Sequence, residues 1–292
     1  MKPRIIFFGS DWGSLFVLNS LVSDKRFKIV GIVTLPAKPQ GRKQALTPNP
    51  VEQYAKTLFE IKFFPFKRFN RQSIDRFKKL KADVGILAWY GKILPKEILE
   101  IPKHGVLNVH PSLLPKYRGP SPVQAAILNG DKKAGVTIFK MDEQMDHGPI
   151  LVQFKEEIKP DDTSQSLYER LFTVGGQSLA TILPSYLEGK IKLRKQNHKM
   201  ATYTRLLNRD SGKICWQDKD KVIERFIRAM HPWPGAWTRV KIPGKRKPKR
   251  LKILKAHLER GKLVLDQVQL EGKKPVTYSQ FQAGYPSARI MK

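Results

Sequence analysis

Residues 83–110 read DVGILAWYGKILPKEILEIPKHGVLNVH and contain two apolar runs joined by a short mixed segment. The runs 83–89 and 105–109 have the length of buried strands, and residues 95–99 between them have the length of one short helix. Strands that are apolar on both sides belong to parallel sheets whose two faces are covered by helices. The stretch therefore predicts a strand–helix–strand unit of an α/β fold.

The same alternation extends toward the amino terminus. Residues 4–9 (RIIFFG) and 28–34 (KIVGIVT) are two further apolar runs, and the segment 15–22 between them has the pattern of a helix. Segments 51–58 and 69–80 predict two more helices before the next strand. Strands and helices in this order indicate an α/β protein with a Rossmann-like, doubly wound and mostly parallel sheet.

After this region the pattern predicts a hairpin and a long helix. The runs 135–141 and 150–154 read as two strands, and residues 164–187 are apolar with a helical period. This helix could close a first domain of residues 1–188.

The rest of the chain has a different character. Residues 189–204 are polar and basic without a clear period, which predicts a linker. Residues 205–292 hold one helical stretch, 221–230, and short apolar runs separated by glycine and proline, which favours a small β-barrel or sandwich. The predicted strands of this second domain are 238–242, 251–256, 262–265 and 268–270.

The charge of the chain is extreme. It has 55 lysine and arginine residues against 25 aspartate and glutamate residues, a net charge of +30. Residues 191–292 hold 26 basic and 7 acidic residues, whereas residues 105–170 hold 8 and 9, so the positive field surrounds a nearly neutral centre. Such a charge indicates a polyanionic partner, nucleic acid or an acidic membrane surface.

Composition excludes several classes of protein. A single cysteine rules out a disulfide framework and a cysteine-based zinc module, and the six histidines lack ligand spacing, so no metal is expected. The sequence has no run of about 18 apolar residues, no signal peptide and no amphipathic anchor. We therefore expect a cytoplasmic protein without a membrane partner, and nucleic acid is the preferred polyanion.

Asn108 and His110 are the first candidates for chemistry. They stand two apart at the end of an apolar strand, so both side chains project to the same side, at the edge where open α/β sheets bind ligands. Asn can donate a hydrogen bond to a developing oxyanion, and His can exchange a proton near neutral pH. The alternative is a capping Asn and a hydrogen-bonded His on the surface.

The loop 141–149 (MDEQMDHGP) offers three carboxylates, Asp142, Glu143 and Asp146. A carboxylate beside His110 would fix the tautomer of the ring and favour the imidazolium. The alternative is that the three acids only solvate a turn, and spacing does not choose among them.

The stretch 108–151, NVHPSLLPKYRGPSPVQAAILNGDKKAGVTIFKMDEQMDHGPIL, resembles the core of the folate-dependent formyltransferases. The family signature is N-x-H followed by SLLP, with an Asp in the loop after the next hairpin strand. The resemblance implies formyl transfer from 10-formyltetrahydrofolate to an amine, with Asn108, His110 and Asp146 as catalytic residues. Asn108 and protonated His110 would stabilise the oxyanion, and Asp146 would orient His110 and help to move a proton.

The resemblance also implies a folate site. The segment 112–115 (SLLP) matches the family segment that contacts the folate, and ILAWYGKILP at 86–95 matches the segment that borders the folate pocket. The residues implied to bind the cofactor are Ser112, Leu113, Leu114, Pro115, Trp89, Tyr90, Gly91 and Asp142.

Three flanking segments are similar to the members of this family that act on methionyl-tRNA: 34–56 (TLPAKPQGRKQALTPNPVEQYAK), 201–216 (ATYTRLLNRDSGKICW) and 231–237 (HPWPGAW). The resemblance implies methionyl-initiator-tRNA as the acceptor, translation initiation as the process, and a monomer. It makes 1–188 the catalytic domain and 205–292 a tRNA-binding barrel of the oligonucleotide-binding type.

Basic residues in three segments are predicted to contact the tRNA. Phosphate contacts position a nucleic acid and make its binding salt-dependent without reading its sequence. The predicted residues are Lys38, Arg42 and Lys43 in the loop after the second strand, Lys192, Arg194 and Lys195 in the linker, and Lys245, Arg246 and Lys247 in the second domain.

One departure from the family pattern bears on the acceptor. After Gly9 the family usually has T-P-x-F near the acceptor amino acid, and this chain has Ser10-Asp11-Trp12-Gly13. Two alternatives follow: a formyltransferase for another amine, such as an amino-sugar nucleotide, or a non-catalytic RNA-binding protein on this scaffold. A basic second domain disfavours the first, and an intact Asn108, His110 and Asp146 disfavour the second.

Overall fold

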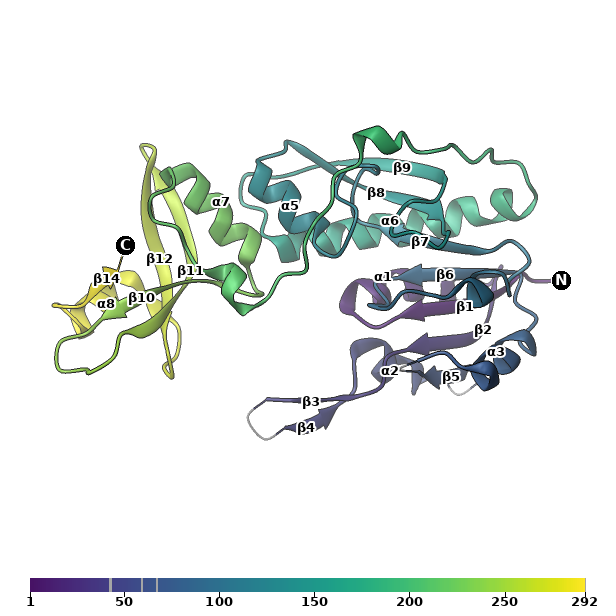
Figure 1. Cartoon of the computed structure of the whole chain (residues 1–292), viewed down its shortest axis with the longest axis horizontal. Helices are drawn as coiled ribbons and strands as arrows, with labels where there is room; N and C mark the ends of the chain where they lie inside the picture. Colours follow the sequence, from purple (N-terminus) through teal and green to yellow (C-terminus); the bar gives the residue numbers. More distant parts are fainter. Residues whose placement is uncertain (42–43, 59, 67, 292) are drawn as a thin grey trace. The chain divides into compact units, whose positions relative to one another are not determined.

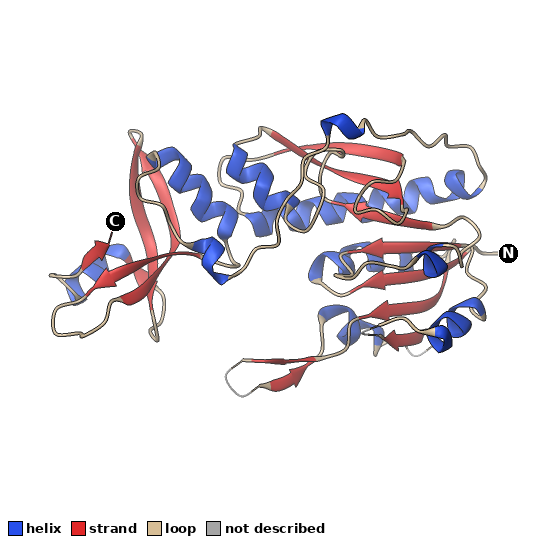
Figure 2. Cartoon of the chain, viewed as in Figure 1, coloured by secondary structure: helices blue, strands red, loops and turns tan. Residues whose placement is uncertain are grey.

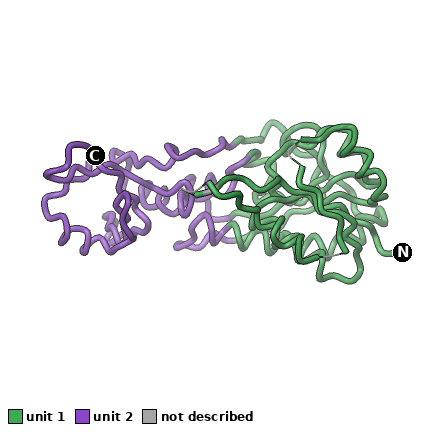
Figure 3. The backbone as a smooth tube through the Cα atoms, turned by 90° about the horizontal axis from the view of Figure 1, so that it is seen from below, with its two compact units in different colours: residues 1–119, 134–156, 168–203 green, residues 120–133, 157–167, 204–292 purple. Residues whose placement is uncertain are grey.

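The computed structural model describes residues 1–41, 44–58, 60–66 and 68–291. These residues form two compact units, each assembled from separate parts of the chain (Figure 3). Unit 1 comprises residues 1–119, 134–156 and 168–203, and unit 2 comprises residues 120–133, 157–167 and 204–292. The predicted boundaries at residues 188 and 205 remain a prediction from sequence.

A seven-stranded sheet with the order β5-β2-β1-β6-β7-β8-β9 organises unit 1 (Figures 1 and 2). The strands β5, β2, β1, β6 and β7 run parallel, and β8 is antiparallel to β7. This confirms the predicted mostly parallel sheet. The bounds are β1 (Arg4–Gly9), β2 (Lys28–Thr34), β5 (Lys62–Pro65), β6 (Val84–Ala88), β7 (Val106–His110), β8 (Lys133–Lys140) and β9 (Ile150–Glu157).

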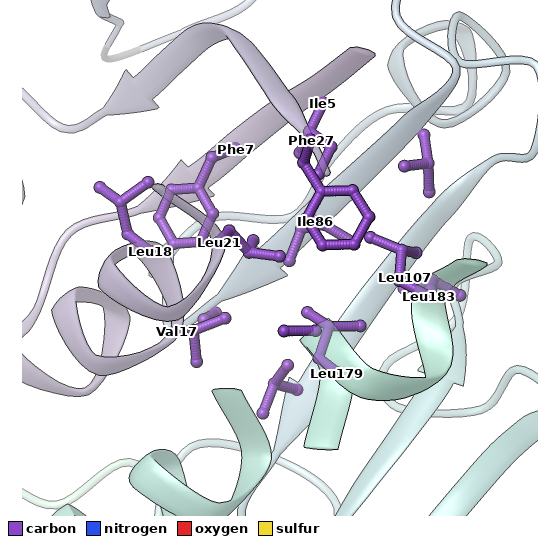
Figure 4. Close-up of a cluster of buried hydrophobic side chains, with 14 of the residues drawn as sticks. Ile5, Phe7, Val17, Leu18, Leu21, Phe27, Ile86, Leu107, Leu179 and Leu183 are labelled. Atoms are coloured by element: carbon purple, nitrogen blue, oxygen red, sulfur yellow. The ribbon is translucent and has the colours of Figure 1, made fainter. Parts of the chain in front are cut away.

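Helices cover both faces of this sheet, as a doubly wound fold requires. The helices are α1 (Trp12–Val22), α2 (Pro50–Ala55), α3 (Arg71–Lys78), α4 (Lys96–Leu99) and α6 (Ser164–Leu187). On one face Phe7 packs with Leu18 of α1 and Leu179 of α6 (Figure 4). On the other face the neighbouring residue Phe8 packs with Phe77 of α3, because successive strand side chains point to opposite sides.

The strand order reverses between β1 and β6. The chain runs from β1 outward through β2 to β5, then returns to β6 on the other side of β1 and continues to β7. Ligands of open α/β sheets bind at the carboxyl ends of strands beside such a switch point. Helix α1, which follows β1, is joined to the end of β6 there, since Ser14 Oγ donates to the carbonyl of Ala88 at 2.6 Å.

Unit 2 contains a five-stranded sheet with the order β13-β12-β11-β10-β14, antiparallel at every pairing (Figure 1). Helices α5 (Pro122–Asn129) and α7 (Asp220–Met230) pack together in this unit, and the Arg225 side chain lies over Gly130, where a Cβ atom would be 1.8 Å from Arg225 Nη1. The remaining elements are β10 (Ala236–Lys241), β11 (Lys249–Glu259), β12 (Lys262–Leu270), β13 (Val276–Thr277), α8 (Tyr278–Gly284) and β14 (Arg289–Met291). The predicted small β domain is thus an antiparallel five-stranded sheet.

Some predicted elements have different bounds. The helix predicted at 51–58 ends at Ala55, and the separate strands predicted at 262–265 and 268–270 were wrong, because β12 runs unbroken through both. Helix α5 was not predicted, since Pro120 lies just before it and Pro122 is its first residue. Within the described residues, no helix combines the length and apolarity needed to cross a bilayer.

A hairpin of β3 (Lys38–Gln40) and β4 (Ala45–Thr47) forms a separate two-stranded sheet. Lys38, predicted to contact tRNA, is exposed on β3. Arg42 and Lys43, the other two residues predicted in this loop, lie outside the described residues.

Candidate active site

The predicted Asn–His pair lies on β7, between β6 and β8. Asn108 is opposite Leu87 of β6 and Phe139 of β8, and His110 is opposite Thr137 of β8. Asn108 is 7% exposed and His110 is 5% exposed. The alternative of a capping Asn and a surface His is therefore wrong, because both residues are inside the sheet at its carboxyl edge.

Both ring nitrogens of His110 face an oxygen atom. Nε2 is 3.0 Å from the carbonyl oxygen of Tyr117, which can only accept, so Nε2 carries a hydrogen. Nδ1 is 3.7 Å from Asp146 Oδ1, which is longer than a hydrogen bond. A reacting oxygen or a water molecule can therefore bridge Nδ1 and the carboxylate.

Asp146 is held by contacts on its main chain and its side chain. The Gly119 main-chain N–H donates to Asp146 Oδ2 at 2.7 Å, which leaves Oδ1 toward His110. Gln196 Nε2 donates to the Asp146 carbonyl oxygen at 2.9 Å. The backbone of Asp146 is left-handed, with φ of +50°, a conformation that is uncommon for residues other than glycine.

The structure chooses among the three carboxylates of this loop. Asp142 Oδ2 is 2.6 Å from His147 Nδ1, and Glu143 Oε1 is 3.6 Å from Lys96 Nζ. Of the three, Asp146 is the carboxylate beside His110. The left-handed turn at Asp146 accounts for this arrangement, and a residue spacing carries no sign of it.

One end of the Asn108 amide has no protein partner. Among the described residues, no donor reaches the buried Asn108 Oδ1. A buried polar atom without a hydrogen bond costs about 1–3 kcal/mol, so this amide oxygen is placed to accept a hydrogen bond from a ligand. The site can thus offer the amide of Asn108, the Nδ1 side of His110 and the Oδ1 side of Asp146 to one reacting group.

The predicted folate segment 112–115 is hydrogen-bonded to β8 and β9. Ser112 Oγ donates to the Lys116 carbonyl at 2.6 Å, and the Leu114 N–H donates to Thr137 Oγ1 at 3.1 Å. Gln153 Nε2 donates to the Leu114 carbonyl at 2.8 Å. Ser112 and Leu114 are buried, whereas Leu113 and Pro115 are half-buried and remain accessible to a ligand.

The predicted folate residues 89–91 use their side chains differently. The Trp89 ring packs against Tyr168 and Phe172, and the buried Tyr90 donates its hydroxyl to the Phe66 carbonyl at 3.1 Å. Burial raises the pKa of Tyr90 above its ordinary value. These two rings belong to the core, so a folate contact here falls to the main chain and to Gly91, which is exposed with φ of +79°.

A cavity of about 710 Å³ opens beside the Asp146 loop. Its lining includes Leu99, Gly105, Met141, Asp142 and Gln144. Ligand sites have volumes of roughly 300–1,000 Å³, so this cavity is large enough for a folate-sized molecule. Of the residues predicted to bind the cofactor, Asp142 lines this cavity, whereas Asn108, His110 and Asp146 do not line it.

A second cavity of about 420 Å³ lies at the end of β1. Its lining includes the altered turn, Ser10, Asp11 and Trp12, together with Lys38 of β3. Asp11 Oδ2 accepts a hydrogen bond from the Tyr168 hydroxyl at 3.0 Å, and Trp12 is 63% exposed. The departure from the family turn thus forms the wall of a pocket.

The residues that are predicted to contact tRNA, where the structure describes them, are all exposed on the surface of their own unit. Lys192, Arg194 and Lys195 are exposed on unit 1, and Arg194 also donates to Gln153 Oε1 at 2.8 Å. Lys245, Arg246 and Lys247 are exposed in the turn between β10 and β11 of unit 2. Their exposure is compatible with phosphate binding.

Sequence reasoning missed three residues that shape the site. Tyr117 and Gly119 act through a main-chain carbonyl and a main-chain N–H, which leave no mark in a sequence. Gln196 was placed in a linker, and its burial within a polar and basic segment became visible only in three dimensions. A single inward-facing residue in that segment has no periodic pattern.

Comparison with known proteins identifies the family to which this fold belongs. A formyl transferase family model matches residues 3–183, and a model of the formyl transferase C-terminal domain matches residues 206–262. The N-formyltransferase of Helicobacter canadensis, solved in complex with folinic acid and dTDP-3-aminofucose, superimposes with a TM-score of 0.66 over 95% of this chain and 99% of its own. At 20% identity this similarity shows a shared fold. The fold and the matched models define a formyl transferase.

Proteins with similar sequences show which formyl transferases this chain resembles. The methionyl-tRNA formyltransferase of Roseiflexus sp. (strain RS-1) is 44% identical over 238 residues, which cover 82% of this chain and 73% of that protein. The methionyl-tRNA formyltransferase of Methylacidiphilum infernorum (isolate V4) is 35% identical over 303 aligned residues, covering 96% and 95% of the two chains. The chain belongs to the methionyl-tRNA formyltransferases, within the formyl transferase family.

Proposed function

We propose that Asn108, His110 and Asp146 perform the formyl transfer that this family catalyses. The chain is a formyltransferase whose donor is 10-formyltetrahydrofolate and whose acceptor is the free amino group of methionyl-initiator-tRNA, in translation initiation. The observation that supports the proposed site is the placement of His110 between the Tyr117 carbonyl and the Asp146 carboxylate.

The reaction joins the amine nitrogen to the formyl carbon and breaks the bond from that carbon to N10 of the folate. One proton leaves the amine and one arrives at N10, so the transfer needs a proton route and a partner for the tetrahedral oxyanion. Asn108 and the Nδ1 side of protonated His110 supply donors for that oxygen. Nε2 is already committed to the Tyr117 carbonyl, so Nδ1 is the nitrogen that serves the substrate.

Asp146 has two tasks in this scheme. Its negative charge stabilises the imidazolium form of His110 while the oxyanion exists. Its Oδ1 atom, which faces the gap of 3.7 Å to Nδ1, is placed to accept the proton of the attacking amine and return it toward N10, directly or through water.

Three purified variants test this assignment: Asn108→Ala, His110→Ala and Asp146→Ala. Formylation of methionyl-tRNA is measured under single-turnover conditions at saturating folate and tRNA. Loss of one well-placed oxyanion donor lowers a rate by about 10²–10³-fold, and we expect a loss of this size for His110→Ala. A His110→Ala protein that formylates at a near wild-type rate would refute the mechanism.

We propose that the cavity lined by Ser10, Asp11 and Trp12 binds the aminoacylated end of the methionyl-tRNA. It lies at the carboxyl end of β1, next to the switch point of the sheet, and Lys38 at its rim supplies a positive charge for a phosphate. An assay that offers methionyl-tRNA and amino-sugar nucleotides in parallel tests the acceptor. Formylation of the sugar nucleotides alone would contradict it.

We further propose that the enzyme acts as a monomer in the cytoplasm, with the exposed basic residues of both units holding tRNA phosphates. Light scattering of the purified protein tests the oligomeric state, and a mass of two chains would contradict it.

A further inference from the structure

Residues 194–203, here called the strap, bind to two loops of unit 1. At one end the main chains of Arg194 and Ile150 exchange two hydrogen bonds of 2.8 Å and 2.7 Å. At the other end the Arg118 N–H donates to the Thr202 carbonyl at 2.8 Å, and the Thr202 N–H donates to the Pro115 carbonyl at 3.2 Å. The strap is therefore fixed to the loop that follows β7 and to the first residue of β9, where the loop 141–149 ends.

Each of these loops contains a residue with an unusual backbone. Tyr117 has φ of +59° and Asp146 has φ of +50°, both in the left-handed region. Residues other than glycine persist in that conformation where their surroundings hold them. The strap holds both: the Tyr117 N–H donates to Thr202 Oγ1 at 2.8 Å, and Gln196 Nε2 donates to the Asp146 carbonyl at 2.9 Å.

These same two residues contact His110. The Tyr117 carbonyl lies 3.0 Å from Nε2, and Asp146 Oδ1 lies 3.7 Å from Nδ1. Both sides of the imidazole therefore depend on residues whose main chains the strap fixes.

The amide of Gln196 has a single possible orientation. Arg118 Nη2 donates to Gln196 Oε1 at 2.7 Å, and a guanidinium cannot accept a hydrogen bond, so the oxygen must face Arg118. The NH₂ group then donates to the carbonyls of Asp146 and Gly148, at 2.9 Å and 2.7 Å. Arg118 is only 1% exposed, so this arrangement is sheltered from water.

We propose that the strap is a positioning element of the formyl transfer, with Gln196 and Thr202 as its positioning residues. Gln196 fixes the main chain of Asp146, which faces Nδ1 of His110, and Thr202 fixes the main chain of Tyr117, which faces Nε2. Neither residue touches the reacting atoms. The inference rests on the proposed roles of His110 and Asp146.

The test uses the full-length protein with Gln196→Glu, Thr202→Val and Thr202→Ser, and with Asn197→Ala as a matched control. Gln196→Glu keeps the size of the side chain and an oxygen for Arg118, but removes both donors to the carbonyls. Thr202→Val removes the acceptor for the Tyr117 N–H, and Thr202→Ser restores it. Asn197 is an exposed neighbour in the strap and serves neither loop with its side chain.

We expect kcat of Gln196→Glu to fall about tenfold or more, since loss of a residue that orients a catalytic group typically costs 10–100-fold. The pH profile of kcat should shift as well, because Asp146 no longer faces Nδ1 in the same way. Thr202→Val should lose several-fold in kcat, Thr202→Ser should recover most of it, and Asn197→Ala should match the wild type. KM for the folate should change less than kcat in every variant.

Gln196→Glu protein with the melting temperature, kcat and pH profile of the wild type would overturn the proposal. If that variant does not fold, the Thr202→Val and Thr202→Ser pair decides, and equal kcat values for the two would overturn it. Asp146→Ala separates the two levels of the argument. If Asp146→Ala is inactive and the strap variants are as active as the wild type, only the positioning role of the strap is refuted. If Asp146→Ala is active, the proposed mechanism itself is refuted.

Discussion

The Asp146 loop, residues 141–149, and the turn between β10 and β11 differ in how they present charged groups: the first holds a carboxylate in place, and the second exposes basic side chains to solvent. Asp146 is 13% exposed, and its main chain and side chain each accept a hydrogen bond. Lys245, Arg246 and Lys247 in the turn are exposed side chains. We propose that a fixed, half-buried group such as Asp146 acts on the transition state, whereas exposed charges contribute additively and are screened by salt. The two regions should therefore fail in different ways when altered.

The largest effect should come from the Asp146 loop. A Cβ atom on Gly148 would lie 1.8 Å from the Lys140 carbonyl oxygen, so Gly148→Ala must move the backbone that ends the loop. We expect a loss of about 1–3 kcal/mol in the free energy of unfolding and about 100-fold in kcat, because a displacement of one ångström can cost that much. Chemical denaturation and single-turnover formylation measure the two quantities.

Gly284→Ala is the matched control, since nothing lies within 4 Å of a Cβ atom there. Its kcat should equal that of the wild type, and its free energy of unfolding should be unchanged or rise by up to about 1 kcal/mol, because alanine is favoured over glycine in a helix. A Gly148→Ala protein with unchanged kcat would mean that the loop tolerates displacement and that the contrast with the basic turn is smaller than we infer.

The basic turn should show an effect on binding and not on the chemical step. The triple variant Lys245→Ala/Arg246→Ala/Lys247→Ala should raise KM for methionyl-tRNA and leave kcat unchanged at saturating tRNA. The slope of log KM against log salt concentration should fall by about one for each phosphate contact that is lost. Titration from 50 to 200 mM salt measures the slope, and an unchanged slope would exclude phosphate contacts by this turn.

The smallest effect concerns pH and the stacked rings of His147 and His198, whose centroids are 3.9 Å apart. Loss of hydration, then the charges of His147 and Arg118, lower the pKa of His198, and Asp142 opposes this shift. The folded state thus binds a proton at His198 less readily than the unfolded state. Stability should rise with pH up to about 6.5, the ordinary histidine pKa, and this contribution should be lost as the pH falls below it.

His198→Gln provides the measurement, because it removes the titrating group from an exposed position. The melting temperature of the wild type should fall more steeply between pH 7 and pH 5.5 than that of His198→Gln. The pKa of His231 is also lowered by burial, and its contribution is common to both proteins. If the melting temperatures of the wild type and His198→Gln change in parallel with pH, protonation of His198 does not contribute to the pH dependence of stability.

The sequence predicted the sheet and the strand β7, which carries Asn108 and His110, because their signals are local. Strands buried on both sides are continuous apolar runs, and the period of two placed Asn108 and His110 on one side of β7. The long helix α6 (Ser164–Leu187) was likewise predicted within its observed bounds, since a helical period sustained over many residues is a strong signal.

The choice of the acid and the contribution of the strap could not be predicted from the residues alone. They depend on left-handed backbone at Asp146 and Tyr117 and on main-chain groups, which any residue type possesses. The resemblance to a family supplied Asp146 where spacing left three carboxylates open. Gln196 lies in a segment whose composition is dominated by exposed basic residues, so its burial had no local signal.

The strap also determines where a catalytic fragment of this enzyme can be cut. A fragment that ends at residue 188 would contain Asn108, His110 and Asp146, yet it would lack Gln196 and Thr202, and with them the supports of both loops. A fragment that ends at Tyr203 would keep them, since unit 1 extends to that residue. Protein engineers who graft this centre onto another acceptor-binding domain should therefore place the junction after residue 203.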